Sequence, residues 1–590
     1  MKSDRPDQPP PSPLAAGLLA LALCLQFLAA SWLWVLMEDS GWFLGKGNYK
    51  TAWASSGYRG LPIEEVATGL NRHLPVETPI RLGSIDPQWA QRLKEGLYPR
   101  RIVPDAPYSL ETGKSPAVPI AASPRGQLVL MGKLPAPPPS PPSGKVDFGR
   151  SWLRVILHLL ASLGWGLALA VVLTRAWRPP ARAPLWPATA LAAPLVWGVL
   201  GTVATLLQRP LPFTALMVLG LVLGAAALVL SLRGRDLRGE WTRRLAWVRQ
   251  PETWGMVAFS ALLVRHMDVW PIVGWDGRSI WLYRAKQIAY NGYLTVADAI
   301  NPENFFSHME YPVLYPTWLA QFLLPGPLRE REVALGIMAL QLLLISTIWW
   351  LARRRLGRWP GAAFTAAVFL LTAANSERGF ADGFISLFLL AMLFLLESEE
   401  LEPLGWLAGL GAALTKGEGL VFAGMAGGLF VLFHPRFRAK RWLPRLAPPL
   451  VLLFGALPPL WAHVIGIKNQ YTGAKLPPTL ALKLDRLLII WNGMGRLARE
   501  LNFVAFIPAA LGIFVVLEIT RRRSWTARIM AAVGVGTVLF SVAVMMVTPY
   551  DVADQVQTAL GRLLCHTAIV LGAAALAALT AEPTPGQPPG

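Results

Sequence analysis

Carboxylates and cationic side chains stand beside long apolar runs in the second half of this chain. Asp276 and Arg278 follow one such run directly, and His308 and Glu310 lie in the polar segment beyond it. An ionisable group near a bilayer is energetically expensive and usually marks a functional site. Here a carboxylate can take a proton from a hydroxyl group, and an arginine can stabilise a developing anion. The structural alternatives are an aspartate that caps the next helix and a hydrogen-bonded loop histidine.

Further charged residues occur at later junctions between apolar runs. Lys416 and Glu418 separate two runs, and Asp382 begins another. Asp382 can cap a helix and Lys416 can extend to the membrane surface, but Lys416 can also hold a phosphate as a point charge. Asp551 precedes the last run and Arg562 lies just inside it. An unpaired charge is costly there, so Arg562 needs a carboxylate or a lipid phosphate as its partner.

Composition identifies an all-α polytopic membrane protein. The 590 residues are 54% hydrophobic and only 15% charged, whereas a soluble protein has about 25% charged residues. Apolar runs of roughly 20 residues predict about 14 spans. We place them near 14–37, 151–174, 184–207, 211–232, 252–271, 331–352, 360–374, 382–397, 403–415, 419–433, 444–466, 503–520, 527–548 and 561–580.

The net charge of +20 does not indicate a nucleic-acid partner, because the arginines are distributed over short loops between spans. The loops at 175–183, 233–251, 353–358, 434–445 and 521–528 are rich in Arg or Lys, and they alternate with poor ones. This pattern puts the N-terminus and the basic loops in the cytoplasm and the candidate residues on the other face. The acidic segment Glu397–Glu402 is an exception on the basic side. The two cysteines give no disulfide framework or metal-ligand spacing.

Five regions follow from these patterns. We expect an N-terminal anchor at 1–37, an extracytoplasmic α/β insert at 38–150, accessory spans at 151–250, a catalytic membrane module at 251–580 and a disordered tail at 581–590. Within the insert, the sequence predicts strands near 75–82, 97–101 and 127–131, a helix around 85–96 and an extended linker at Pro135–Lys145.

Two motifs connect the candidate residues to a known family. The run Trp-Asp-x-x-x-Ile-Trp-x-x-x-Ala-Lys extends from Trp275 to Lys286, and His-x-x-Tyr-Pro-x-Leu-x-Pro extends from His308 to Pro316. Together with the segments around Asp382, Lys416 and Arg562, they resemble bacterial membrane glycosyltransferases of the GT-C superfamily. These are relatives of the protein O-mannosyltransferases and aminoarabinose transferases. The resemblance covers roughly 250–570.

The resemblance implies an inverting transfer of sugar from a polyprenyl-phosphate donor to an acceptor hydroxyl. Asp276 corresponds to the family's base, and Asp382 to an acidic residue that helps to bind a divalent cation, Mg or Mn, in some members. On this basis we expect Asp382, His308 and Glu310 to position a metal or the acceptor. We expect Lys416, Arg562 and Arg278 to bind the donor phosphate, with Glu418 and Asp551 as further candidates.

The expected location is the bacterial inner membrane, with the site facing the periplasm or exterior. The partners would be membrane lipids, the lipid-linked donor and a lipid, glycan or protein acceptor. The alternative function is a transporter or flippase of a lipid-linked envelope precursor, for which charged groups near mid-membrane are expected.

Overall fold

The computed structural model describes parts of the chain up to residue 131 and most of the chain after it. The later ranges are 148–177, 185–232, 276–323, 330–377, 379–439, 448–467, 480–500, 502–519, 524–548 and 551–579, with residues 254 and 257. The predicted anchor, linker, span at 252–271 and tail lie outside the described residues, apart from residues 22, 254 and 257.

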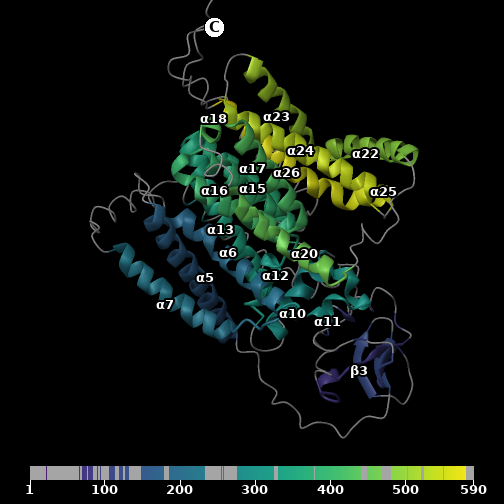
Figure 1. The fold of residues 1–590 in the computed structure, drawn as a ribbon. Coiled ribbons are helices and arrows are strands. Elements are labelled where there is room, and N and C mark those ends of the chain that lie inside the picture. The colour runs from purple at the N-terminus through teal and green to yellow at the C-terminus, as the bar shows by residue number, and fades with distance from the viewer. Residues whose placement is uncertain are drawn as a thin grey trace, which may run out of the picture.

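The described chain is mostly helical, with one small sheet (Figure 1). Six of its described helices are long and apolar enough to cross a membrane: Leu153–Leu173, Leu185–Leu207, Phe213–Ser231, Val333–Leu356, Trp525–Val547 and Gly561–Leu579. Four shorter apolar helices accompany them, at Asp382–Leu396, Gly417–Phe433, Pro449–Val464 and Phe506–Glu518. The fold is therefore that of a helical membrane protein, and the count of 14 spans stays a prediction.

Three helices form a layer on one side of the molecule: α5 (Phe148–Trp177), α6 (Leu185–Leu207) and α7 (Phe213–Leu232). The backbones of α5 and α7 approach closely, because a Cβ on Gly164 would lie 2.0 Å from the carbonyl oxygen of Gly220. Small residues permit such close contacts between membrane helices. α6 lies inward of this pair and packs against α13 and α16.

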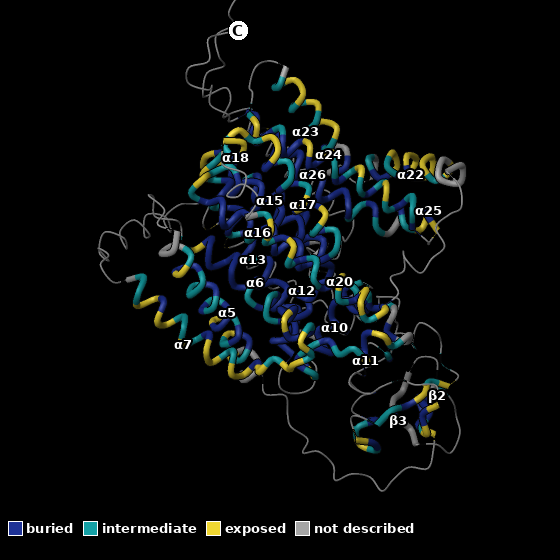
Figure 2. The backbone as a smooth tube through the Cα atoms, in the orientation of Figure 1, coloured by how far each residue is buried: buried dark blue, intermediate teal, exposed yellow. Residues whose placement is uncertain are grey.

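The main bundle is arranged around α15 (Asp382–Leu396), whose 15 residues are all buried. A helix that is hydrophobic on every side belongs in a protein interior. Figure 2 shows this interior as the dark centre of the molecule. The helices around α15 are α13 (Glu330–Leu356), α14 (Arg358–Glu377), α16 (Glu402–Thr415), α17 (Gly417–Phe433) and α26 (Gly561–Leu579). α24 (Trp525–Val547) packs against α17 and α26, and α23 (Asn502–Ile519) packs against α26.

One end of this bundle, here called the basic end, contains arginines together with the acidic segment Glu397–Glu402. Arg355, at the end of α13, lies 2.8 Å from Glu397, at the end of α15. Arg436, in α18 (Pro435–Arg438), lies 3.5 Å from Glu402, at the start of α16. The acidic segment therefore has a structural reason to share a face with the basic loops, because it neutralises them.

The sheet has the strand order β1-β2-β4-β3 and a separate hydrophobic core that includes Val66, Leu93 and Leu128. Its strands are β1 (Arg81–Leu82), β2 (Ser109–Thr112), β3 (Val118–Ser123) and β4 (Gly126–Met131). The strand predicted near 127–131 is confirmed as β4. The sequence missed β3, which contains Pro119 and occupies a sheet edge, where proline is tolerated.

Candidate functional site

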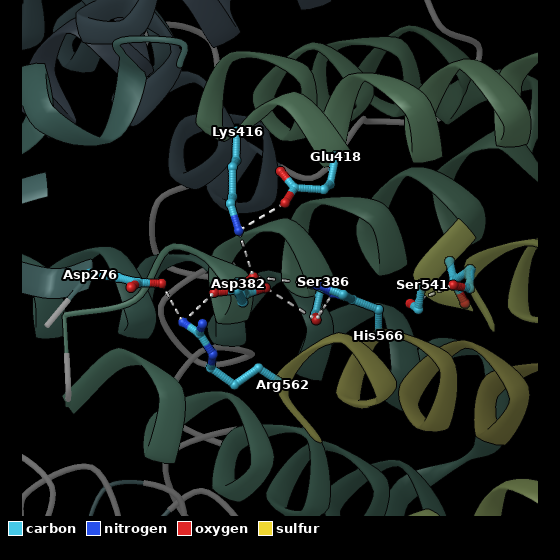
Figure 3. Close-up of polar contacts among 9 residues, drawn as sticks. Asp276, Asp382, Ser386, Lys416, Glu418, Ser541, Arg562 and His566 are labelled. Carbon is cyan, nitrogen blue, oxygen red and sulfur yellow. Dashed lines mark hydrogen bonds and ion pairs between the residues drawn. The ribbon is translucent and has the colours of Figure 1, made fainter. Parts of the chain in front are cut away.

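Five predicted residues meet at the end of the bundle opposite the basic end, and each is placed there by a helix terminus (Figure 3). Asp276 precedes the π-helix η1 (Gly277–Leu282), and Asp382 opens α15. Lys416 lies between α16 and α17, Glu418 is in the first turn of α17, and Arg562 is the second residue of α26. Chain segments nearly 300 residues apart in sequence thus contribute to one cluster, here called the charged cluster.

Asp382 is the buried centre of the charged cluster. Its carboxylate accepts a hydrogen bond of 3.2 Å from Lys416 Nζ and lies 3.6 Å from Arg562 Nη1. The first turn of α15 places this carboxylate at the positive end of the helix dipole, which favours a negative charge. Two cations from two other helices are therefore held by a single acidic side chain.

Arg562 connects the buried centre to Asp276. Its Nη1 donates a hydrogen bond of 2.7 Å to Asp276 Oδ2, and its guanidinium lies 4.2 Å from the centre of the Phe380 ring. The Asp276 side chain makes no capping hydrogen bond to the following helix, so the helix-cap interpretation does not hold. As the sequence predicted, Arg562 has a carboxylate partner.

Arg562 keeps hydrogen-bonding capacity beyond these two contacts. A guanidinium carries five N–H donors. The buried Nε atom of Arg562 has no hydrogen-bond partner within the described part of the chain. Because the contacts to Asp276 and Asp382 both use Nη1, the guanidinium has further N–H groups for an anion, but the buried Nε is not open to a ligand in this conformation.

Lys416 closes the opposite side of the charged cluster. Its Nζ lies 3.0 Å from Glu418 and 5.8 Å from the centre of the Tyr311 ring. Burial by itself would lower the pKa of Lys416, but Asp382 and Glu418 outweigh it and raise that pKa well above its usual range. Lys416 is therefore protonated at any physiological pH.

The second motif forms a loop beside Lys416. His308 Nδ1 lies 3.1 Å from Glu310 Oε1, and the His308 ring stacks on Tyr311 at 4.9 Å between centroids. The backbone of His308 has a φ of 47°, which is uncommon for a residue other than glycine. Arg284 donates a hydrogen bond to the Tyr311 carbonyl oxygen and fixes the loop from below. His308 and Glu310 thus form a pair that Tyr311 links to the charged cluster.

The two remaining predicted residues have other surroundings. Asp551 is exposed at the start of α25 (Val552–Gln555), where its carboxylate accepts a hydrogen bond from the Asp554 backbone N–H. This is the ordinary capping role. Arg278 is buried within η1.

Sequence reasoning missed His566 and Ser386, which support Asp382 from inside the bundle. His566 is fully buried in α26, and its Nδ1 lies 2.7 Å from Ser386 Oγ in α15. Its Nε2 lies 4.0 Å from Asp382 Oδ1. The spacing in the sequence could have indicated His566, because it follows Arg562 by four residues and so lies on the same face of the helix.

The exposure of the charged side chains decreases from the rim of the site to its centre. Asp276, Arg562 and Glu418 have relative side-chain exposures of 23%, 19% and 18%, whereas Asp382 has 4%. A ligand arriving from outside would therefore meet Asp276 and Arg562 before Asp382. A small recess, large enough for about one water molecule, has Tyr311 in its lining together with Thr202, Met309, Val313, Pro458 and Trp461.

The charged cluster offers cations more readily than metal ligands. Among the described residues, no three His, Cys, Asp or Glu side chains lie close enough together to hold one metal ion. Asp382 is already neutralised by Lys416 and Arg562, and a divalent cation would have to compete with both charges. The Mg or Mn ion that the resemblance implied therefore stays a prediction.

Comparisons with family models, with curated proteins and with solved structures find no match to this chain. The GT-C resemblance therefore stays a prediction from the motifs, and the functional argument depends on the geometry of the site.

Proposed function

We propose that this protein is a membrane glycosyltransferase that moves a sugar from a polyprenyl-phosphate donor to an acceptor hydroxyl. The supporting observation is the chain of contacts from Asp276 through Arg562 and Asp382 to Lys416. It puts a rim carboxylate beside two cations that can bind phosphate, at one end of a membrane-type bundle. Transfer from a lipid phosphate needs both a base for the acceptor and cations for the departing phosphate.

In the proposed reaction, the acceptor oxygen attacks the anomeric carbon of the donor sugar with inversion. The bond from that carbon to the phosphate oxygen breaks, and its electron pair leaves with polyprenyl phosphate. The proton of the acceptor hydroxyl passes to Asp276. The guanidinium of Arg562 stabilises the charge of the leaving phosphate, and Lys416 adds a second positive charge.

Asp382 has a positioning role in this proposal. It lies too deep to reach the acceptor first, but it holds both Lys416 and Arg562. His308 and Glu310 lie on the Tyr311 side and are candidates for orienting the acceptor. Preorganised charges of this kind stabilise a transition state without reorganising during the reaction.

We place the site on the periplasmic or outer face of a bacterial inner membrane. The support is the separation of the basic end from the charged cluster, because arginine-rich loops remain in the cytoplasm. The acceptor would be a lipid, glycan or protein hydroxyl.

The test uses purified protein in lipid nanodiscs with radiolabelled polyprenyl-phosphate sugars. Release of polyprenyl phosphate is compared between wild type and Asp276→Asn, with the exposed Asp551→Asn as the matched control. We expect Asp276→Asn to slow release by about 10²- to 10⁴-fold while donor binding is retained, as for loss of a general base. Asp551→Asn should behave as wild type, and a metal chelator should leave release unchanged.

Other outcomes point elsewhere. Release that is insensitive to Asp276→Asn would refute the role of this base. Transbilayer movement of the intact donor, without any release, would instead support a flippase. Loss of activity on chelation would show that the reaction needs a metal ion. If Asp382 bound that ion, its contacts with Lys416 and Arg562 would have to break.

A further inference from the structure

Helix α22 (Leu480–Glu500) lies at the edge of the bundle and has three different faces (Figure 1). Successive residues of an α-helix are about 100° apart around its axis. Ile490, Gly493 and Leu497 share one side and are buried against the bundle. Leu487, Leu488 and Trp491 share a second side, which faces away from the bundle. The third side carries the exposed polar residues Asp485, Asn492 and Arg496, with Ile489 between them at 41% exposure.

The position of α22 is fixed by the end of a candidate membrane span. Arg486 Nη1 donates hydrogen bonds of 2.8 Å to the Met546 carbonyl oxygen and 2.9 Å to that of Thr548, where α24 ends. A span of this length ends near the boundary between hydrocarbon and water. These two bonds therefore hold the first half of α22 at the level of the membrane surface, on the site side of the bundle.

The second side of α22 is unusually apolar for a surface at that level. Trp491 is 70% exposed and Leu488 is 63% exposed, and Figure 2 shows a large part of the helix as exposed. Tryptophan favours the headgroup level of a membrane. A helix with adjoining apolar and charged faces is also the type that lies in this interface.

We infer that α22 is an interfacial helix whose Leu487, Leu488 and Trp491 face contacts the lipid of the bilayer surface, while Asp485, Asn492 and Arg496 face water. Two observations together carry this inference: Arg486 is bonded to the end of a candidate span, and the exposed surface of α22 has one apolar side and one mainly polar side. A second copy of the chain could also cover the apolar side. A protein contact would not explain why a polar side adjoins it at the level where the span ends, whereas the boundary between lipid and water does.

The experiment places a nitroxide label at single introduced cysteines in the full chain, reconstituted in nanodiscs. The background is Cys24→Ser, and Cys565 is retained because it is buried. Leu488→Cys and Trp491→Cys report the apolar side, and Asn492→Cys and Arg496→Cys are the matched controls on the polar side. All four positions are exposed, so a label can be attached at each. Collision rates are measured with oxygen, which enters lipid, and with a water-soluble nickel chelate.

We expect oxygen to dominate at 488 and 491 and the nickel chelate to dominate at 492 and 496. Equal access of the chelate to all four positions would place α22 in water and overturn the inference. Low access of both reagents at 488 and 491, with spin–spin broadening, would show a protein contact and overturn it as well. These readings do not depend on transferase activity, so they stand apart from the proposed function.

Discussion

Removing the buried carboxylate at the centre of the charged cluster should destabilise the protein through the cations that it leaves behind. Asp382→Asn keeps the size of the side chain but deletes the negative charge that faces Lys416 and Arg562. Breaking a buried ion pair from one side costs about 3–5 kcal/mol in general. Here the loss should lie near 3 kcal/mol, because Lys416 retains Glu418 at 3.0 Å and Arg562 retains Asp276 at 2.7 Å.

A double-mutant cycle isolates the contribution of the pair. Lys416→Met removes the cation and leaves Asp382 with Arg562 at 3.6 Å. In the double variant both charges of the pair are absent, so neither is left buried opposite the place of the other, and we expect the double variant to be more stable than the sum of the single effects by about 1–3 kcal/mol. The assay is thermal unfolding of the purified protein in one detergent, with apparent Tm values compared at a single heating rate, because unfolding of large proteins is commonly irreversible.

Two controls separate this effect from a general loss of charge. Glu418→Gln should lower Tm less, because Glu418 is partly exposed and Lys416 keeps Asp382. Asp551→Asn should leave Tm unchanged, since asparagine caps a helix as well as aspartate does. Strict additivity of Asp382→Asn and Lys416→Met would refute the reasoning, because it would mean that the two charges do not interact.

Three further predictions follow from other contacts. Arg562→Lys should slow transfer by about 10- to 100-fold in the nanodisc assay. Nη1 of Arg562 contacts both carboxylates, and a lysine ammonium has no further planar N–H groups to offer the phosphate at the same time. Wild-type rates in this variant would argue against that role of the guanidinium. Gly419→Ala should destabilise by about 1–3 kcal/mol in thermal unfolding, since its Cβ would lie 2.0 Å from a carbonyl oxygen of α16, whereas Gly424→Ala, with nothing within 4 Å, should have no such effect. Burial, together with Arg436, lowers the pKa of His434 to about 4, so the unfolded chain binds a proton at higher pH than the folded one and stability should fall as pH decreases from about 6.5 to 4. His434→Gln should reduce this fall when Tm is measured across that range, and an identical fall in the variant would assign it to other groups.

Much of the charged cluster could be predicted from the sequence, because the sequence shows which charged residues lie at the ends of apolar runs, where a charge is energetically costly. Such residues are few. Because basic and non-basic loops alternate along the chain, these residues are all assigned to the membrane face opposite the basic loops. Asp276, Asp382, Lys416, Glu418 and Arg562 could therefore be selected together, and the structure brings them into contact. The pairing of Arg562 with Asp276 could not be derived, because packing between distant segments decides which carboxylate it meets.

Other features depend on tertiary packing that a linear pattern does not contain. Asp551 has the same sequence signal as Asp382, yet it caps a short exposed helix. His566 lies in an apolar run, and its importance appears only because α26 packs beside α15. The number of spans is also hard to derive, since α15 at about 22 Å is shorter than a bilayer of about 30 Å. Surrounding protein, rather than lipid, accounts for its apolar sequence.

Asp276 and Arg562 both lie next to π-helical turns. The contact between them therefore depends on how many residues each turn contains. η1 begins immediately after Asp276, and η5 (Val556–Leu560) ends two residues before Arg562. A π turn closes its hydrogen bond over one residue more than an α turn does. Shortening either segment by one residue would let it close as an ordinary α-helix while turning the attached side chain away from its partner. The extra residue in each π turn thus sets the direction of the neighbouring side chain, and through it whether Asp276 and Arg562 face each other.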